Sequence, residues 1–192
     1  MQTAMNTWIS GPTGAGKTSL CQIFRSLGCA IVEERFSEST FTGFTKDPIR
    51  YCAQLQEEIM RSRFEGWKML IDTPRVVFDR SIDEDVHVFC KMHFELGFLS
   101  DKEFQNLRDF ACQLQTLLPT PDLIIFMRPP SNILANRVTV QSHPLSIVRN
   151  LERQVSLYSE WLKTRTENIL LLDNSRCELG TLKRLFSEGT RW

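Results

Sequence analysis

The segment at residues 10–20 is Ser10-Gly11-Pro12-Thr13-Gly14-Ala15-Gly16-Lys17-Thr18-Ser19-Leu20. It contains the full pattern GxxxxGK[ST], directly after an apolar run and before a helical pattern. The glycines let successive backbone N–H groups point at phosphate oxygens, and the following helix N-terminus adds a favourable dipole. Lys17 is expected to reach the β- and γ-phosphates, and the Thr18 hydroxyl to coordinate magnesium. Residues 11–19 are therefore predicted to bind ATP.

Short apolar runs alternate with long helical patterns along the rest of the chain. The runs are typical of buried strands, and the alternation favours a parallel sheet covered on both faces. We therefore predict an α/β fold of three layers, the P-loop NTPase fold, with a five-stranded parallel sheet flanked by helices. The expected strands lie at 7–10, 30–32, 76–78, 123–126 and 169–172, and the expected helices at 17–27, 47–66, 82–117 with a break near Gly97, 131–139, 144–165 and 177–188.

Length and composition limit the classes of protein that fit. A chain of 192 residues with 42% hydrophobic content suits a single domain, so residues 1–192 are treated as one unit. Lys plus Arg (23) balances Asp plus Glu (23), which argues against a nucleic-acid partner. No apolar stretch is long enough to span a bilayer, and no signal peptide is evident, so a cytoplasmic protein without a membrane partner is expected. The six cysteines and three histidines lack metal-ligand spacing.

Charged residues follow two of the predicted strands, at the point where each strand ends. The second strand runs into Glu33-Glu34, and the third runs into Asp79-Arg80-Ser81. In such sheets ligands bind at the carboxyl ends of the strands. An acidic residue there can accept a proton from a hydroxyl acceptor, while an arginine can hold the acceptor and the transferring phosphoryl group. The pattern indicates phosphoryl transfer to a hydroxyl group.

Together with the phosphate loop, the residues at these strand ends make nearly the whole chain resemble the deoxynucleoside kinase family, whose members phosphorylate the 5′-hydroxyl of deoxynucleosides. The resemblance implies that Glu34 is the catalytic base, with Glu33 as the alternative. The segment from Asp47 to Gln56 is similar to the family segment in which a helical glutamine hydrogen-bonds the base, which makes Gln56 the base reader. Arg63, seven residues later, matches an arginine near the same base.

The segment Asp79-Arg80-Ser81-Ile82-Asp83-Glu84-Asp85 resembles the D/E-R-S signature of the family with its downstream aspartate. The resemblance assigns Asp79 to the magnesium ion or its water shell, Arg80 to the 5′ position and Asp85 to the base pocket beside Arg63. It also implies a nucleoside as substrate and a homodimer as the assembly. Four phenylalanines are candidates for the wall of the base pocket, namely Phe36, Phe44, Phe89 and Phe94.

Two positions depart from the family pattern. Thr45 stands where the family usually places a tyrosine that touches the sugar 3′-hydroxyl, so Thr45 is the candidate sugar contact. The lid, expected at about 136–144, offers one arginine, Arg137, where the family has several. Arg137 is therefore the candidate lid residue for catalysis.

Alternative interpretations remain at this stage. Gln54 and Gln56 could both be solvated residues of a helix face, and Arg63 with Asp85 could be a structural ion pair. A nucleoside monophosphate kinase would need an arginine cluster near residues 40–75, where Arg61 and Arg63 stand. A weakly active nucleotide-binding relative that serves as a regulatory or assembly subunit would fit the sparse lid.

Overall fold

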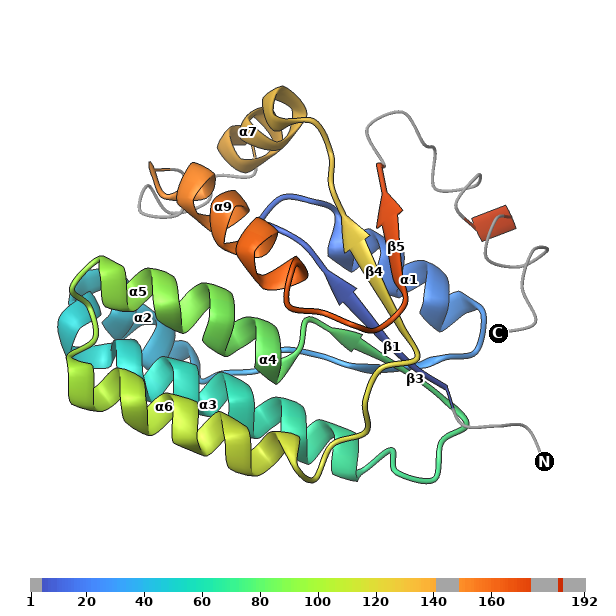
Figure 1. Cartoon of the computed structure of the whole chain (residues 1–192), viewed down its shortest axis with the longest axis horizontal. Helices are drawn as coiled ribbons and strands as arrows, with labels where there is room; N and C mark the ends of the chain where they lie inside the picture. The colour runs from blue at the N-terminus through green and yellow to red at the C-terminus, as the bar shows by residue number, and fades with distance from the viewer. Residues whose placement is uncertain (1–4, 141–148, 174–182, 185–192) are drawn as a thin grey trace.

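The computed structural model describes residues 5–140, 149–173 and 183–184. Its centre is a sheet of five parallel strands in the order β2-β3-β1-β4-β5 (Figure 1). This confirms the predicted α/β fold. The strands are β1 (Met5–Ser10), β2 (Ala30–Val32), β3 (Arg75–Asp79), β4 (Leu123–Met127) and β5 (Ile169–Leu172). Within the described ranges, no helix is both long and apolar enough to cross a membrane.

Alternate residues of the central strands face opposite sides of the sheet, as the two-residue period of a strand requires. In β1, Trp8 packs into one apolar cluster and Ile9 into another. In β4, Ile124 and Phe126 join Trp8, whereas Ile125 joins Ile9. Both faces of the sheet are therefore covered, which explains why these strands read as continuous apolar runs.

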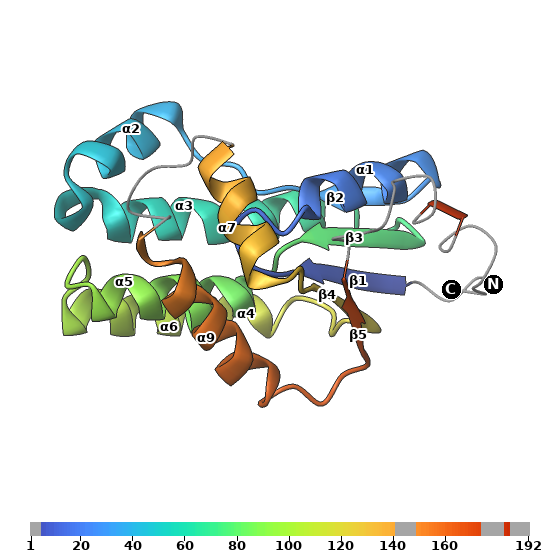
Figure 2. The same cartoon turned by 90° about the horizontal axis from the view of Figure 1, so that it is seen from above.

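The helices cover the two faces and extend beyond the sheet. Helix α1 supplies Leu20, Ile23 and Phe24 to the cluster that contains Ile9, and helix α9 supplies Trp161 to the cluster that contains Trp8. Helices α2, α3, α5 and α6 lie together to one side of the sheet (Figures 1 and 2). The helices are α1 (Lys17–Ser26), α2 (Glu38–Lys46), α3 (Pro48–Lys68), α4 (Ile82–Glu84), the π-helical segment η1 (Asp85–Cys90), α5 (Lys91–Glu95), α6 (Asp101–Gln115), α7 (Ser131–Val140) and α9 (Leu151–Leu162).

Most of the expected helices are present, with some changes in their boundaries. The break near Gly97 is confirmed, because α5 ends at Glu95 and Ser100 caps α6 in a reciprocal box with Glu103. Helix α2 was not expected from the sequence. The helix expected at 144–165 is represented by α9, and the one expected at 177–188 lies almost entirely outside the described residues.

Candidate active site

The loop after β1 has the backbone geometry of a phosphate-binding loop. Gly14 and Gly16 have positive φ angles of 78° and 95°, which side chains rarely adopt. A Cβ atom on Gly11 would lie 2.6 Å from the carbonyl oxygen of Met127 in β4, so only glycine fits there. The loop is also held from outside, because the backbone N–H of Thr13 donates to the side-chain oxygen of Gln154 at 2.8 Å.

Lys17 lies inside this loop and is 8% exposed. Its Nζ donates to the carbonyl oxygens of Gly11 and Pro12, each at 2.9 Å. Burial, together with the charge of Arg80, lowers the pKa of Lys17 to about 7. A bound phosphate would favour the ammonium form and raise that pKa again. Thr18, at the next position, is exposed at the first turn of α1.

Arg80, at the end of β3, has a strained backbone and a tightly held side chain. Its φ of 70° makes it a residue other than glycine in the left-handed region. Its Nη1 donates to Gly11 O at 3.2 Å, to Glu84 Oε1 at 2.6 Å and to the hydroxyl of Tyr158. The guanidinium carbon lies 4.5 Å from the centre of the Phe89 ring. These contacts fix a buried cation beside the phosphate loop.

The two adjacent glutamates after β2 point to different places. Glu34 lines the cavity described below, and its Oε2 lies 2.9 Å from Arg63 Nη2 and 3.9 Å from Arg80 Nε. Glu33 is exposed and pairs with Arg25 of α1. Glu34 is therefore the glutamate that the fold places next to Arg80.

Arg63 connects the acidic residues behind the cavity wall. It is fully buried, and it donates from Nε to Asp85 Oδ2 at 2.8 Å, from Nη2 to Glu34 and from Nη1 to the carbonyl oxygen of Asp79. Burial raises the pKa of Asp85 to about 6, although the charge of Arg63 acts in the opposite direction. Arg63 and Asp85 thus form the pair expected from the sequence. Arg63 is not among the side chains that line the cavity.

A cavity of about 250 Å³ extends from the phosphate loop into the helical layer. Gln56 lines the cavity and is 3% exposed. Its side-chain oxygen accepts a long hydrogen bond of 3.6 Å from the thiol of Cys90. Gln54 is exposed instead, and its amide donates to Glu58 and Thr40. The lining residues are Thr13, Glu34, Phe36, Phe41, Phe44, Leu55, Gln56, Ile59, Arg80, Asp85, Phe89, Met92, His93 and Gln154.

Aromatic rings make up much of the cavity wall. Phe36, Phe44 and Phe89 line it as expected, and Phe41, which was not predicted, stacks on Phe36 with ring centres 5.1 Å apart. Phe94 lies elsewhere, stacked on Phe104 in the cluster between the helices. Flat apolar walls with a few polar groups are typical of a site for a planar ring.

Two other predicted residues lie outside the cavity. Thr45 is exposed, and its hydroxyl donates back to the carbonyl oxygen of Thr42, so the structure does not bring it to the cavity. Arg137 lies on α7 next to the phosphate loop, where its Nη1 is 3.4 Å from the carbonyl oxygen of Ala15. Residues 141–144 of the expected lid lie outside the described ranges.

Three functional residues were not identified from the sequence. Glu84 and Tyr158 hold Arg80, and the Tyr158 hydroxyl also donates to Glu84. Gln154 holds the phosphate loop. The spacing of four between Arg80 and Glu84 was an available signal for that pair, although the predicted helix began only at residue 82. The other two come from α9, which is distant in sequence, and no local pattern marks them.

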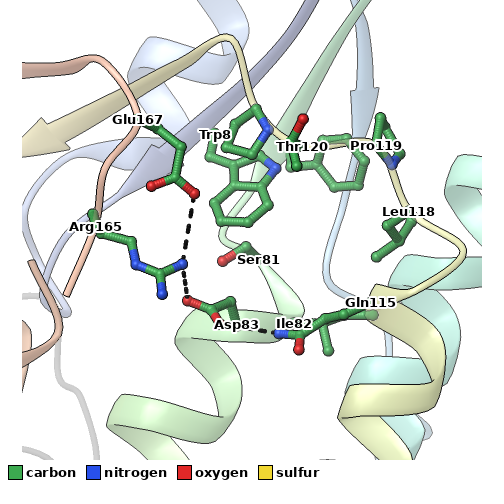
Figure 3. A pocket seen from close by; sticks show the side chains of 12 residues that line it. Trp8, Ser81, Ile82, Asp83, Gln115, Leu118, Pro119, Thr120, Arg165 and Glu167 are labelled. Carbon is green, nitrogen blue, oxygen red and sulfur yellow. Dashed lines mark hydrogen bonds and ion pairs between the residues drawn. The ribbon is translucent and has the colours of Figure 1, made fainter.

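The segment after β3 is also anchored from the side away from the cavity described above. Figure 3 shows Asp83 at the edge of a second cavity, of about 200 Å³, with its carboxylate directed toward Arg165 and Gln115. Arg165 Nη1 lies 2.8 Å from Asp83 Oδ2, and Gln115 donates to Oδ1 at 3.1 Å. The indole N–H of Trp161 donates to the same carboxylate. These bonds fix the backbone that carries Arg80 and Asp85.

The described residues do not gather three or more His, Cys, Asp or Glu side chains into a metal cluster. Magnesium in nucleotide sites usually takes one or two protein oxygens together with phosphate oxygens and water. The Thr18 hydroxyl and the Asp79 carboxylate at the end of β3 fit that limited role. They remain the predicted ligands.

Comparisons with known proteins agree with this geometry. A family model described as deoxynucleoside kinase matches residues 8–186. A deoxyadenosine kinase of Dictyostelium discoideum is 34% identical over 155 residues, which cover 78% of this chain and 59% of that protein. A deoxyadenosine/deoxycytidine kinase of Bacillus subtilis is 28% identical, with 83% of this chain and 74% of that protein covered.

A solved structure of similar fold is that of deoxyadenosine kinase from M. mycoides with bound dATP. It has a TM-score of 0.78 and 22% identity, and the match covers 95% of this chain and 97% of the other. A second structure of that kinase, described as having products dCMP and a flexible dCDP bound, gives a TM-score of 0.76. At this identity, both show that the fold is shared.

Proposed function

The chain belongs to the deoxynucleoside kinase family, and we propose that it transfers the γ-phosphoryl group of ATP, with Mg²⁺, to the 5′-hydroxyl of a deoxynucleoside. The observation that carries the proposal is the single cavity lined by Thr13 of the phosphate loop, by Glu34 and Arg80, and by Gln56 deeper in the helical layer. A donor phosphate, a hydroxyl acceptor and a planar base would each meet suitable groups there. A cytoplasmic location and a homodimer are part of the same proposal.

In this reaction Glu34 accepts the proton of the 5′-hydroxyl as its oxygen attacks the γ-phosphorus. Arg63 holds the Glu34 carboxylate from behind at 2.9 Å, so the base has a fixed position. Arg80 and Lys17 place positive charge where negative charge develops on the transferring group. Glu84 and Tyr158 keep the Arg80 guanidinium in place. Mg²⁺ would bridge the donor phosphates and further reduce their charge.

Recognition of the base rests on Gln56 and on the aromatic wall. The Gln56 amide offers a donor and an acceptor to one edge of a base, and it has only a weak contact with Cys90 to give up. Phe89, whose ring centre lies 4.5 Å from the Arg80 guanidinium carbon, also lines the cavity and offers a flat ring for stacking. Asp85, paired with Arg63, adds an acceptor to the same wall.

The two other functions fit less well. A monophosphate kinase needs cations for the acceptor phosphate, but Arg61 is exposed and paired with Glu57, and Arg63 is enclosed and paired with Asp85. A regulatory subunit without activity would not need Glu34 and Arg80 in the arrangement described above. The kinase proposal uses both residues.

The decisive experiment combines binding with product formation. The melting temperature of the purified protein is measured with each common deoxynucleoside, with and without ATP and Mg²⁺. In a separate reaction, folded protein is incubated with the same mixtures and the products are separated by chromatography. A ligand at 100 times its dissociation constant adds about 2.7 kcal/mol of stability, which is readily measured as a shift in melting temperature. A deoxynucleoside 5′-monophosphate that is formed by the wild type and not by Lys17→Ala supports the proposal. Nucleoside binding without any product would refute it.

A further inference from the structure

His93 lines the cavity from α5, and its ring makes no hydrogen bond to the described residues. It is 8% exposed, and its ring centre lies 5.4 Å from that of Phe44 and 6.0 Å from that of Phe98. Its Nδ1 is enclosed and has no partner among the described residues. The backbone carbonyl of His93 is paired, with the N–H of Phe98. Only the imidazole is therefore unsatisfied.

An imidazole in this position weakens the protein when the cavity is empty. Burial alone lowers the pKa of His93 to about 4, so the ring is neutral at physiological pH. A neutral imidazole still carries one donor and one acceptor, and both need partners. Buried polar groups are nearly always paired, and an unpaired one costs stability that an apolar side chain of similar size would not. The enclosed Nδ1 accounts for that cost, whereas Nε2 is not enclosed and is the ring nitrogen left for a ligand in the cavity.

The arrangement of the cavity indicates what that ligand is. Glu34 and Arg80 mark the end at which a 5′-hydroxyl would react. Asp85, Phe89 and His93 follow each other at intervals of four residues along η1 and α5, and all three line the cavity. The ring of His93 packs against that of Phe44, another residue that lines the cavity, with ring centres 5.4 Å apart. His93 thus lies at the aromatic end of the cavity, where the base would be.

We infer that His93 hydrogen-bonds a heteroatom on the edge of the nucleobase and is a specificity-determining residue for the base. This inference rests on the proposed function, because it presumes that a nucleoside fills the cavity. Gln56 and His93 would then contact the base from two helices, α3 and α5. Base selection would depend on how the donor and acceptor of the imidazole match the polar edge that faces them. A base with the wrong pattern would leave the imidazole unpaired, as it is in the empty cavity.

The test compares His93→Leu with two other variants. Leucine has a similar volume and removes both ring nitrogens, whereas His93→Gln keeps a donor and an acceptor. His87→Leu is the matched control, since His87 lies on the same helical run, is exposed and does not line the cavity. For each protein, the melting temperature without ligand and the dissociation constants of the four common deoxynucleosides are measured. The 2′,3′-dideoxy form of the best ligand is included.

We expect His93→Leu to melt no lower than the wild type and to bind the preferred deoxynucleoside roughly 10- to 100-fold more weakly. The other bases should lose less affinity, so that the preference between bases becomes smaller. His93→Gln should recover part of the affinity, and His87→Leu should bind like the wild type. The loss should be the same for the deoxy and dideoxy ligands.

Several results would overturn the inference. A loss seen only with the 3′-hydroxyl present would place His93 on the sugar, and an equal loss for all bases with a lower melting temperature would make it a packing residue. Unchanged binding in His93→Leu, while the wild type phosphorylates nucleosides, would refute the inference and leave the proposed function intact. A wild type that binds no nucleoside would refute both.

Discussion

Substituting Glu34 by glutamine tests the step on which the proposed chemistry depends. Glutamine keeps the size and an acceptor oxygen but cannot take a proton, so turnover should drop by roughly 10²–10⁴. The side chain should stay in place, because Arg63 Nη2 can still donate to the amide oxygen that replaces the acceptor at 2.9 Å. Nucleoside affinity should therefore change little.

The cost to stability follows from the same contacts. Arg63 is fully buried and keeps its charged partner Asp85 at 2.8 Å, so Glu34→Gln weakens one of two ion pairs without stranding the cation. Exchanging a charged acceptor for a neutral one at this position costs about 1 kcal/mol. For a chain of this size, that lowers the melting temperature by about 2–4 °C. A larger decrease would show that Glu34 is chiefly a structural partner of Arg63.

The matched control is Glu33→Gln, since Glu33 is the adjacent residue of the same type. Glu33 is exposed and pairs with Arg25 at the surface, a contact that contributes little. Steady-state kinetics with the preferred nucleoside, nucleoside titration and thermal melting are measured for both variants. Full turnover in Glu34→Gln, or a loss confined to Glu33→Gln, would refute the assignment of the base.

Three further predictions concern the rest of the site. Lys17→Ala should abolish measurable triphosphate binding in calorimetry with the fold retained. In the wild type, triphosphate affinity should fall as the pH rises above 7, because phosphate favours the protonated form of Lys17, whose pKa without ligand is about 7. Gln56→Ala should weaken nucleoside binding by about 1–3 kcal/mol, whereas the exposed Gln54→Ala should have little effect, and equal small effects would contradict the base-reading role. Arg137→Ala should lower turnover by roughly 10³-fold or more with unchanged nucleoside affinity; insensitivity would show that Arg137 is not the lid cation.

The features that could be predicted from the sequence are those encoded by neighbouring residues. The phosphate loop is set by glycines at fixed spacing, and its backbone has the positive φ angles that this spacing requires at Gly14 and Gly16. The strands are apolar runs of a few residues bounded by polar ones, so their positions and their parallel arrangement were predicted and confirmed. The family was likewise predicted from local motifs, and the match over residues 8–186 confirms it.

Helix α2 could not be predicted because tertiary contacts, rather than local preference, hold it in place. Its sequence from Glu38 to Lys46 is rich in threonine and contains Gly43, which are weak helix formers. Ser37 caps it through Thr40, and Gly43 packs so closely on Tyr51 of α3 that an added Cβ would lie 2.8 Å from the ring. A contact with a later helix therefore determines this one.

The choice between adjacent residues also needed the fold. The resemblance favoured Glu34 over Glu33 as the base but left Glu33 as the alternative. In the structure Glu34 lies beside Arg63 and Arg80, whereas Glu33 pairs with Arg25. The π-helical turn that begins at Asp85 is a similar case. π-Helical turns are rare overall, and those that occur often lie at functional sites. No residue pattern in the sequence predicts this one.

Features that cost stability, namely a strained backbone and buried polar atoms without partners, are concentrated around the proposed site. Arg80 adopts a left-handed backbone conformation, and buried atoms without partners among the described residues include Ser10 Oγ beside the phosphate loop, Glu84 Oε2 behind Arg80 and His93 Nδ1 in the cavity. Each feature costs stability, so the surrounding structure must hold it in place. Arg165 Nε is unpaired as well, but it lies beside Asp83, which anchors the same segment. A fold optimised only for stability would place apolar or paired groups at these positions. His93 lines the cavity, Glu84 holds Arg80, and Ser10 precedes the phosphate loop, so the cost falls on residues that shape the site.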